Sequence, residues 1–158
     1  MKRKPRVWIA IALLHGHAYA SSARWKDNGN RTLTDTSTGL QWTARDNRDD
    51  VDWAGAKRYC HTLRLAGGHW RLPEVDELAG LYVDDGDVDE TTWCYMKYPC
   101  KVSARFSLTS WSFWSATPAE EDKIGNAQAW YVYFLNGDRD RDRVVAAYDY
   151  RALCVRRP

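Results

Sequence analysis

The C-terminal third of the chain carries aromatic, arginine and aspartate side chains at spacings suited to ligand binding. Tyr131 and Tyr133 alternate with Trp130, Val132 and Phe134, which predicts a strand with one set of rings in the core and the two tyrosines outside. Aromatic faces stack on the C–H surfaces of sugars, and the arginine guanidinium binds carboxylate or sulfate. The predicted ligand-binding residues are Tyr131, Tyr133, Asp138, Arg139, Arg141, Arg143 and Tyr148.

The same run also has a purely structural interpretation. Arg and Asp alternate from Asp138 to Arg143 and can neutralise one another on a solvated hairpin, which would protect a sheet edge from pairing. Arg151, Arg156 and Arg157 add positive charge that, with the hairpin arginines, could attract a sulfated polysaccharide. The aspartates of the run weaken that case, so the sequence leaves both interpretations open.

Four cysteines offer either two disulfides or a reactive site. Cys60, Cys94, Cys100 and Cys154 allow three pairings, and their spacing favours Cys94 with Cys100 and Cys60 with Cys154. Zinc sites use close C-x-x-C or H-x-x-x-H pairs, which the sequence lacks, so no metal site is predicted. Cys94 and Cys100 could instead form the reactive pair of an oxidase, although in an exported chain their spacing favours a structural bridge. No nucleophile with a neighbouring base is recognisable, and we expect a protein that is not an enzyme.

An acidic run in the middle of the chain is the one candidate for cation binding. It supplies oxygen ligands of the kind that calcium prefers, from Asp84, Asp85, Asp87, Asp89 and Glu90. Its spacing differs from that of an EF-hand loop, and acidic turns are usually solvated. We therefore expect no cofactor, with calcium as the alternative.

Residues 1–20 have the pattern of a secretory signal peptide. A basic start precedes an apolar run of eight residues, Val7 to Leu14, and the small-x-small site Ala18-Tyr19-Ala20. A bilayer span needs about 20 residues, so no permanent membrane anchor is predicted. Without the four basic residues of the leader, 19 of the 23 Lys and Arg remain against 21 Asp and Glu, a formal net charge of −2. We expect a periplasmic or extracellular protein that binds a glycan, another cell-surface ligand or a protein, and not nucleic acid, for which no motif is present.

Periodicity and turn signals predict the elements that must position these residues. Residues 24–43 contain short strands with turns at Asn28-Gly29 and at 37–39. Asp52 is a suitable N-cap for a helix to about Leu63, on which Cys60 points inward. A second helix is predicted over 73–82, and strands over 113–116, 130–134, 144–147 and 153–156, with a hairpin turn at 136–137.

The run from Trp70 to Pro73 is the most distinctive short motif, and we interpret it as structural. Pro73 presets the start of the second helix, and Arg71 can bond carbonyl groups or a buried carboxylate such as Glu77. The residues of this structural motif are Trp70, Arg71, Leu72, Pro73 and Glu77.

The length of 158 residues predicts one domain, over residues 21–158 once the leader is removed. Hydrophobic residues at 44% and charged residues at 28% exclude a disordered or multi-span membrane chain. The predicted fold is α+β, with two helices packed on a small twisted antiparallel sheet, long loops and two disulfides.

These motifs together resemble the Lcl C-terminal domain family over about residues 28 to 156. The resemblance rests on 28–42, on the helix with Trp53, Ala56, Tyr59, Cys60 and Leu63, on 68–73 with Glu77 and Leu78, and on 113–117, 130–134 and 154–156. It implies a C-type-lectin-like fold related to the formylglycine-generating enzyme, and a role as an adhesin-like binding domain, some members binding sulfated glycans. The chain departs from the family pattern at His69 and Glu74, which concern the entry into the second helix.

Family membership does not determine a ligand. We expect a binding domain that recognises a glycan, sulfated or not, through its C-terminal hairpin. One alternative is a protein-binding display surface varied by a diversity-generating retroelement. A second is an oxidase resembling the formylglycine-generating enzyme.

Overall fold

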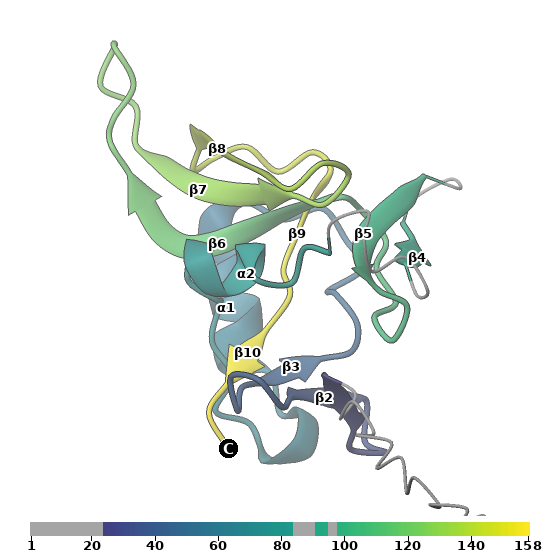
Figure 1. Ribbon diagram of the computed structural model, residues 1–158. Coiled ribbons are helices and arrows are strands. Elements are labelled where there is room, and N and C mark those ends of the chain that lie inside the picture. The colour runs from purple at the N-terminus through teal and green to yellow at the C-terminus, as the bar shows by residue number, and fades with distance from the viewer. Residues whose placement is uncertain (1–23, 84–90, 95–97) are drawn as a thin grey trace, which may run out of the picture.

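The computed structural model describes residues 24–83, 91–94 and 98–158, which form a mixed α/β fold (Figure 1). The predicted signal peptide and the acidic run 84–90 lie outside the described residues. Figure 1 shows a four-stranded sheet at each end, with helix α1 (Trp53–Thr62) running from one toward the other.

The first sheet combines the predicted N-terminal strands with the end of the chain. β1 (Trp25–Asp27), β2 (Thr32–Asp35) and β3 (Gln41–Thr43) form an antiparallel meander, and β10 (Val155–Arg156) pairs with β3. Gly29 and Gly39 each adopt a φ of 72° in the two turns, a backbone conformation that glycine reaches without steric cost. The predicted turns are therefore confirmed.

Helix α1 begins and ends where the sequence predicts. The Asp52 side chain accepts a hydrogen bond from the Gly55 amide at 2.7 Å, which satisfies one of the free N–H groups of the first turn. Trp53 Nε1 donates to the carbonyl of Ser115 at 2.7 Å and holds the start of the helix on the second sheet. Near the other end, the buried Cys60 forms a disulfide with Cys154, beside β10. The helix thus connects the two sheets, with the pairing that the spacing favours.

The segment after α1 is extended and joins the first sheet. It passes through a 3₁₀ turn, η1 (Leu65–Gly67), and Arg71 then exchanges two main-chain hydrogen bonds of 2.9 Å with Val155. The Arg71 side chain donates two bonds of 2.7 Å to the Glu77 carboxylate, one to each oxygen, as the sequence suggests. The run from Trp70 to Pro73 therefore has a structural role, since Arg71 holds this segment beside Val155 and binds Glu77.

The second helix is shorter than predicted. α2 spans Val75–Ala79, and its N-cap is Glu74. The helix does not start at Pro73 because the carbonyl of Pro73 accepts a hydrogen bond from the Ala116 amide, which keeps the chain extended there. The helix ends before Gly80, a poor helix former, and the next residues continue in tight turns with Leu81 in the core. The predicted extension to Tyr82 is wrong for that reason.

A two-stranded ribbon leads from α2 toward the second sheet. β4 (Thr91–Trp93) and β5 (Pro99–Ser103) pair antiparallel. Cys94 and Cys100 form a disulfide across the end of this ribbon, with their Cα atoms 5.5 Å apart.

The second sheet differs from the prediction in two strands. It contains β6 (Ser112–Ala119), β7 (Gln128–Tyr133), β8 (Asp138–Arg143) and β9 (Tyr150–Arg151) in the order β8-β7-β6-β9, with β9 parallel to β6. The charged run 138–143 itself returns along β7, whereas the predicted strand 144–147 begins a loop. After a tight hairpin turn, the residues that follow at once must pair with the strand that precedes the turn. This constraint outweighs the higher β propensity of the valines in 144–147.

The described residues therefore form two four-stranded sheets and a ribbon, and the expected single antiparallel sheet is wrong. The strand predicted over 153–156, which a single sheet would place beside the hairpin, pairs with β3 instead, because the disulfide and the Arg71 bridge hold it beside the first sheet.

Both faces of the second sheet are covered. The face toward α2 contributes Phe113, Val132 and Phe134 to a core shared with the first sheet. The opposite face contributes Trp114, Ala129 and Tyr150 to a core shared with α1 and Cys60. Little of this sheet is left for a ligand except its edge strand β8 and the ends of its strands.

The two disulfides should differ in their contribution to stability. The Cys60–Cys154 bridge spans 94 residues and the Cys94–Cys100 bridge spans 6. In the chain-entropy model these loops contribute about 4.7 and about 2.2 kcal/mol. We expect Cys60→Ala with Cys154→Ala to lower the free energy of unfolding, measured by urea denaturation, more than Cys94→Ala with Cys100→Ala. Equal losses would contradict this ranking.

The Arg71–Glu77 pair predicts a pH dependence of stability. The hydrogen bonds from Arg71 lower the pKa of Glu77 below its ordinary value of 4.5. Because the folded pKa is lowered, the pair stabilises the fold above the unfolded pKa, and this contribution is lost as the pH falls through the folded pKa. Glu77→Gln should therefore melt at a lower temperature than the unmodified protein at neutral pH. In acid, where Glu77 is protonated, the two melting temperatures should become equal. The exposed Glu120→Gln is the control, and a Glu77→Gln effect that is constant with pH would refute the linkage.

Candidate functional site

The pairing of β7 with β8 separates the predicted ligand-binding residues onto two faces of the sheet. Residues opposite each other in an antiparallel pair share a face. Asp138, Asp140 and Asp142 lie opposite Tyr133, Tyr131 and Ala129, whereas Arg139, Arg141 and Arg143 lie opposite Val132, Trp130 and Gln128. The tyrosines therefore share a face with the aspartates, and the three arginines lie on the other face.

Tyr131 is half-buried and serves the second core. Its ring packs edge-on against Trp114, with centroids 6.1 Å apart, and against Tyr150, with centroids 5.0 Å apart. The Tyr150 hydroxyl donates to Asp142 at 2.8 Å, and burial raises the pKa of Tyr150 far above its ordinary value. Burial also raises the pKa of Tyr131, with the charge of Asp140 adding to the effect. These side chains keep the edge strand on the core.

Tyr133 lies in a shallow groove with two other rings. Its ring is 6.5 Å from that of Trp111, and Trp111 is 5.7 Å from Tyr98, both edge-on. With Leu135 these residues line a cavity of about 300 Å³, which we name the aromatic groove.

Tyr148 lies in the loop between β8 and β9 and is 80% exposed.

Several arginines of the predicted basic patch have partners within the protein. Arg139 forms an ion pair with Asp76 of α2, and Arg151 with Asp50. Arg156 stacks on Trp70 at 4.5 Å and donates to the carbonyls of Ala66 and Gly68. Their positive charges are therefore used to join segments of the fold.

A different set of arginines surrounds a cavity of about 680 Å³. One wall is α1 and the turn after it, and the other wall is the loop that follows β3. Its arginines are Arg31, Arg45, Arg48 and Arg64. A second cavity of about 340 Å³ shares Arg31 and Arg45 and adds Arg105. We name the two together the arginine cleft.

The cleft arginines have few partners among the described residues. Arg31, Arg45, Arg64 and Arg105 are exposed, and no ion pair or side-chain hydrogen bond joins them to another described side chain. Arg48 Nη2 donates to Ser107 Oγ at 3.3 Å. The cleft therefore presents guanidinium groups to solvent.

The one carboxylate among the described residues lining the larger cavity is Asp46, and it is committed to the fold. It accepts from the amide and hydroxyl of Thr109, at 2.6 and 2.9 Å, and from the Arg48 amide at 3.1 Å. Burial raises its pKa, although these hydrogen bonds act in the opposite direction. Asp46 thus ties the Arg48 turn to the residues before β6.

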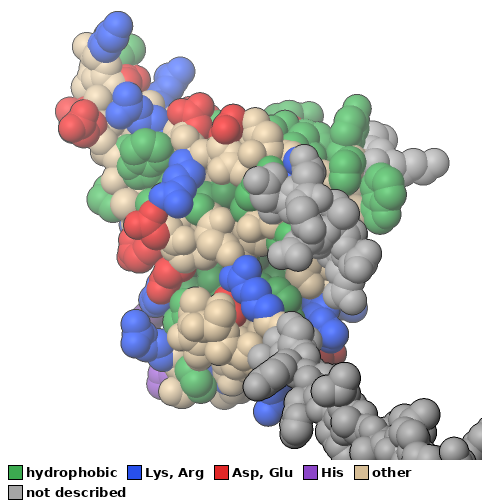
Figure 2. Space-filling view, in the orientation of Figure 1, with side chains coloured by type: hydrophobic (Ala, Val, Ile, Leu, Met, Phe, Trp, Pro, Cys, Tyr) green, Lys and Arg blue, Asp and Glu red, His purple; other side chains and the backbone are tan. Residues whose placement is uncertain are grey.

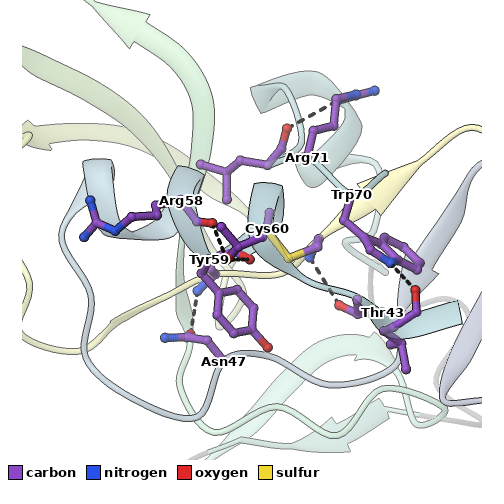
Figure 3. The surroundings of a disulfide bond; sticks show 12 residues. Thr43, Asn47, Arg58, Tyr59, Cys60, Trp70 and Arg71 are labelled. Atoms are coloured by element: carbon purple, nitrogen blue, oxygen red, sulfur yellow. Dashed lines mark hydrogen bonds between the residues drawn. A yellow bond between two sulfur atoms is a disulfide. The ribbon is translucent and has the colours of Figure 1, made fainter. Parts of the chain in front are cut away.

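The disulfide lies directly behind the cleft. Figure 3 shows the ring of Tyr59, the residue before Cys60, next to Asn47, and shows Thr43 near the disulfide, where its hydroxyl accepts from the Cys154 amide at 3.2 Å. All three residues line the larger cavity. The pKa of Tyr59 is raised by burial and further by the charge of Asp46, whereas the charge of Arg31 lowers it. The ring gives the cleft an aromatic wall among its cationic groups.

Two cleft arginines adopt a backbone conformation that disfavours side chains. Arg31 has a φ of 65° and Arg48 a φ of 62°. The left-handed region costs an ordinary L-residue roughly 1–2 kcal/mol, and glycine visits it freely. Glycine would therefore suit these turns better if their only role were to fold.

No pattern in the sequence identifies the arginine cleft. Its arginines come from positions 31 to 105, at intervals that follow no strand or helix period. The one local signal was an arginine at the end of a turn-forming run, as in Asn28-Gly29-Asn30-Arg31.

Within the described ranges, no three His, Cys, Asp or Glu side chains lie together as a metal site would require. Neither α-helix in that part of the chain has the length and apolar character needed to span a membrane.

Comparison with known proteins finds one family. No curated protein and no solved structure matches the chain, so the C-type-lectin-like fold remains a prediction. The model of the Lcl C-terminal domain matches residues 31–156, which include both disulfides and both walls of the arginine cleft. The chain therefore belongs to the Lcl C-terminal domain family.

Proposed function

We propose that this domain is an adhesin-like binding domain that holds an anionic glycan in the arginine cleft. Membership of the Lcl C-terminal domain family suggests the adhesin-like role. The observation that carries the choice of ligand is the larger cavity of this cleft, of about 680 Å³, which is lined by four arginines and, among the described residues, by one carboxylate that is already hydrogen-bonded.

Arginine is suited to this ligand class. Its planar fork donates two parallel hydrogen bonds to a sulfate or carboxylate group, and it stays charged at every physiological pH. Five guanidinium groups around two cavities that share Arg31 and Arg45 could bind successive charged groups along a polysaccharide. The second cavity is also lined by Asp27, whose carboxylate accepts a hydrogen bond from the Gly29 amide at 2.8 Å. The mature chain is expected to have a formal net charge of −2, so attraction would come from this local surface.

The hairpin is a weaker location for the same ligand. Its arginines and its tyrosines lie on opposite faces, so one sugar could not contact both sets across the strand. Arg139 also forms an ion pair with Asp76, which makes its guanidinium group less available to bind an anion. We therefore place the anionic glycan in the arginine cleft.

We further propose that the domain is not an enzyme and acts in the periplasm or outside the cell. All four cysteines form disulfides, which supports a structural role for Cys94 and Cys100 over a reactive pair. Stable disulfides also favour an oxidising compartment.

Sulfated dextran tests the proposed function against unsulfated dextran of the same length. We expect the sulfated polymer alone to bind, and to bind more weakly at about 0.5 M than at about 0.1 M NaCl, because salt screens the arginines. Arg45→Gln with Arg64→Gln should weaken binding at least tenfold, since a hydrogen bond to a charged group contributes about 1.5–3 kcal/mol.

The matched control is Arg58→Gln with Lys123→Gln, which removes the same charge from two exposed basic residues outside the cleft. Isothermal titration calorimetry measures both pairs. An equal loss in the two double variants would show that overall charge, and not the cleft, binds the polymer.

The strained arginines should show opposite effects on stability and on binding. Arg31→Gly and Arg48→Gly relieve the left-handed conformation, so the free energy of unfolding should stay constant or rise by up to about 1 kcal/mol. Affinity for sulfated dextran should fall in the same variants because each loses a cleft guanidinium. Lower stability together with unchanged affinity would mean that these side chains serve the fold.

A further inference from the structure

We propose that the aromatic groove is a second subsite, which stacks an uncharged sugar ring. This proposal rests on the proposed glycan binding for its ligand class, but it names different residues and a different chemistry. The groove and the arginine cleft share no lining residue.

The groove brings together rings from three segments of the chain. Tyr98 immediately precedes β5, Trp111 precedes β6, and Tyr133 ends β7, with Leu135 beside it. Tyr98 is 55% exposed, and Trp93 of the same ribbon is 66% exposed. Figure 2 shows hydrophobic side chains gathered in this region, over β4 and β5. Large rings left in water in this way mark binding surfaces.

Hydrogen-bonding groups lie at the turn end of the same sheet face. Asp138 lies directly opposite Tyr133 in the pairing of β7 with β8. Asn136 Nδ2 donates to Asp138 Oδ2 at 2.6 Å, and the Asp138 amide donates back to Asn136 Oδ1 at 3.1 Å. This mutual bonding holds a carboxylate and an amide in place, and the second oxygen of Asp138 forms no hydrogen bond with another described residue. Such groups accept hydrogen bonds from sugar hydroxyls while the rings cover the C–H face.

The charge on this face favours an uncharged ligand. Asp138 and Asp140 share it, and no ion pair joins either of them to a cation among the described residues. A sulfated or carboxylated sugar would be repelled here, in contrast to the arginine cleft. The cavity of about 300 Å³ is at the small end of the range for small-molecule sites, about 300–1,000 Å³, which suits one ring of a longer chain.

Neutral β-linked glucose oligosaccharides, cellohexaose and laminarihexaose, test the subsite at about 0.5 M NaCl, where the arginine cleft is screened. We expect one or both to bind with a change in tryptophan fluorescence, since Trp111 lines the groove, and with an affinity that hardly changes with salt. Tyr98→Ala should weaken that binding at least tenfold. Asp138→Ala should weaken it as well and leaves the rings in place.

The control variants are Ile124→Ala, an exposed apolar side chain outside the groove, and Arg58→Gln, an exposed arginine outside the arginine cleft, both of which should bind the neutral hexasaccharide as the unmodified protein does. Near-ultraviolet circular dichroism and melting temperature establish that each variant is folded.

Three results would overturn the subsite. They are no binding of either neutral hexasaccharide, an affinity unaffected by Tyr98→Ala and Asp138→Ala, or self-association that Tyr98→Ala abolishes, which would make a second copy the occupant. If sulfated dextran still binds in the arginine cleft, the subsite alone has failed. If sulfated dextran also fails to bind, the proposed function has failed with it.

Discussion

The disulfide between Cys60 and Cys154 is the constraint on which the rest of the structure depends. Cys154 lies between β9, which belongs to the second sheet, and β10, which belongs to the first. Its carbonyl accepts from the Thr43 amide at 2.9 Å, and its amide donates to the Thr43 hydroxyl at 3.2 Å. The bond therefore joins the helix, the end of β3 and both sheets in one place.

The same connection determines the shape of the arginine cleft. One wall is the side of α1 that carries Tyr59, adjacent to the disulfide. The other wall is the loop after β3, where Asn47 exchanges hydrogen bonds with Ala152, at 3.1 Å from its amide and 2.8 Å to its side-chain oxygen. Because both walls are attached to residues 152–154, the fold fixes their separation. A cleft built in this way can present charged groups to a ligand with little loss of conformational entropy.

The arginines of the protein have two different roles. Arg24, Arg71, Arg139 and Arg151 are paired with carboxylates, and the pairs of Arg139 and Arg151 join segments that are distant in the chain. The cleft arginines are exposed, and two of them occupy left-handed positions. A residue that is strained and makes no ion pair among the described residues is poorly explained by stability, which is why we assign these arginines to binding.

The sequence by itself determined the features that depend on neighbours along the chain. The Asp52 cap and the apolar period placed α1, and glycine placed the turns. Arg71 and Glu77 are six residues apart, and a bond to this carboxylate was one of the two roles that the sequence suggested for Arg71. The cysteine pairing was also predictable, since spacing favoured one of three possibilities. These features have a period or a short range, so a single stretch of chain carries the whole signal.

Only the tertiary structure decided which surfaces are available to a ligand. The strand period puts the aspartates and arginines of β8 on opposite faces, but only the pairing with β7 shows that the tyrosines share the aspartate face. Tyr131 was expected outside and is half-buried, because Trp114 and Tyr150 pack against it from other strands. The arginine cleft combines positions 31, 45, 48, 64 and 105, and whether each charge has a partner depends on distances in space. A cavity has no sequence period, since it forms where separate segments fail to fill the space between them.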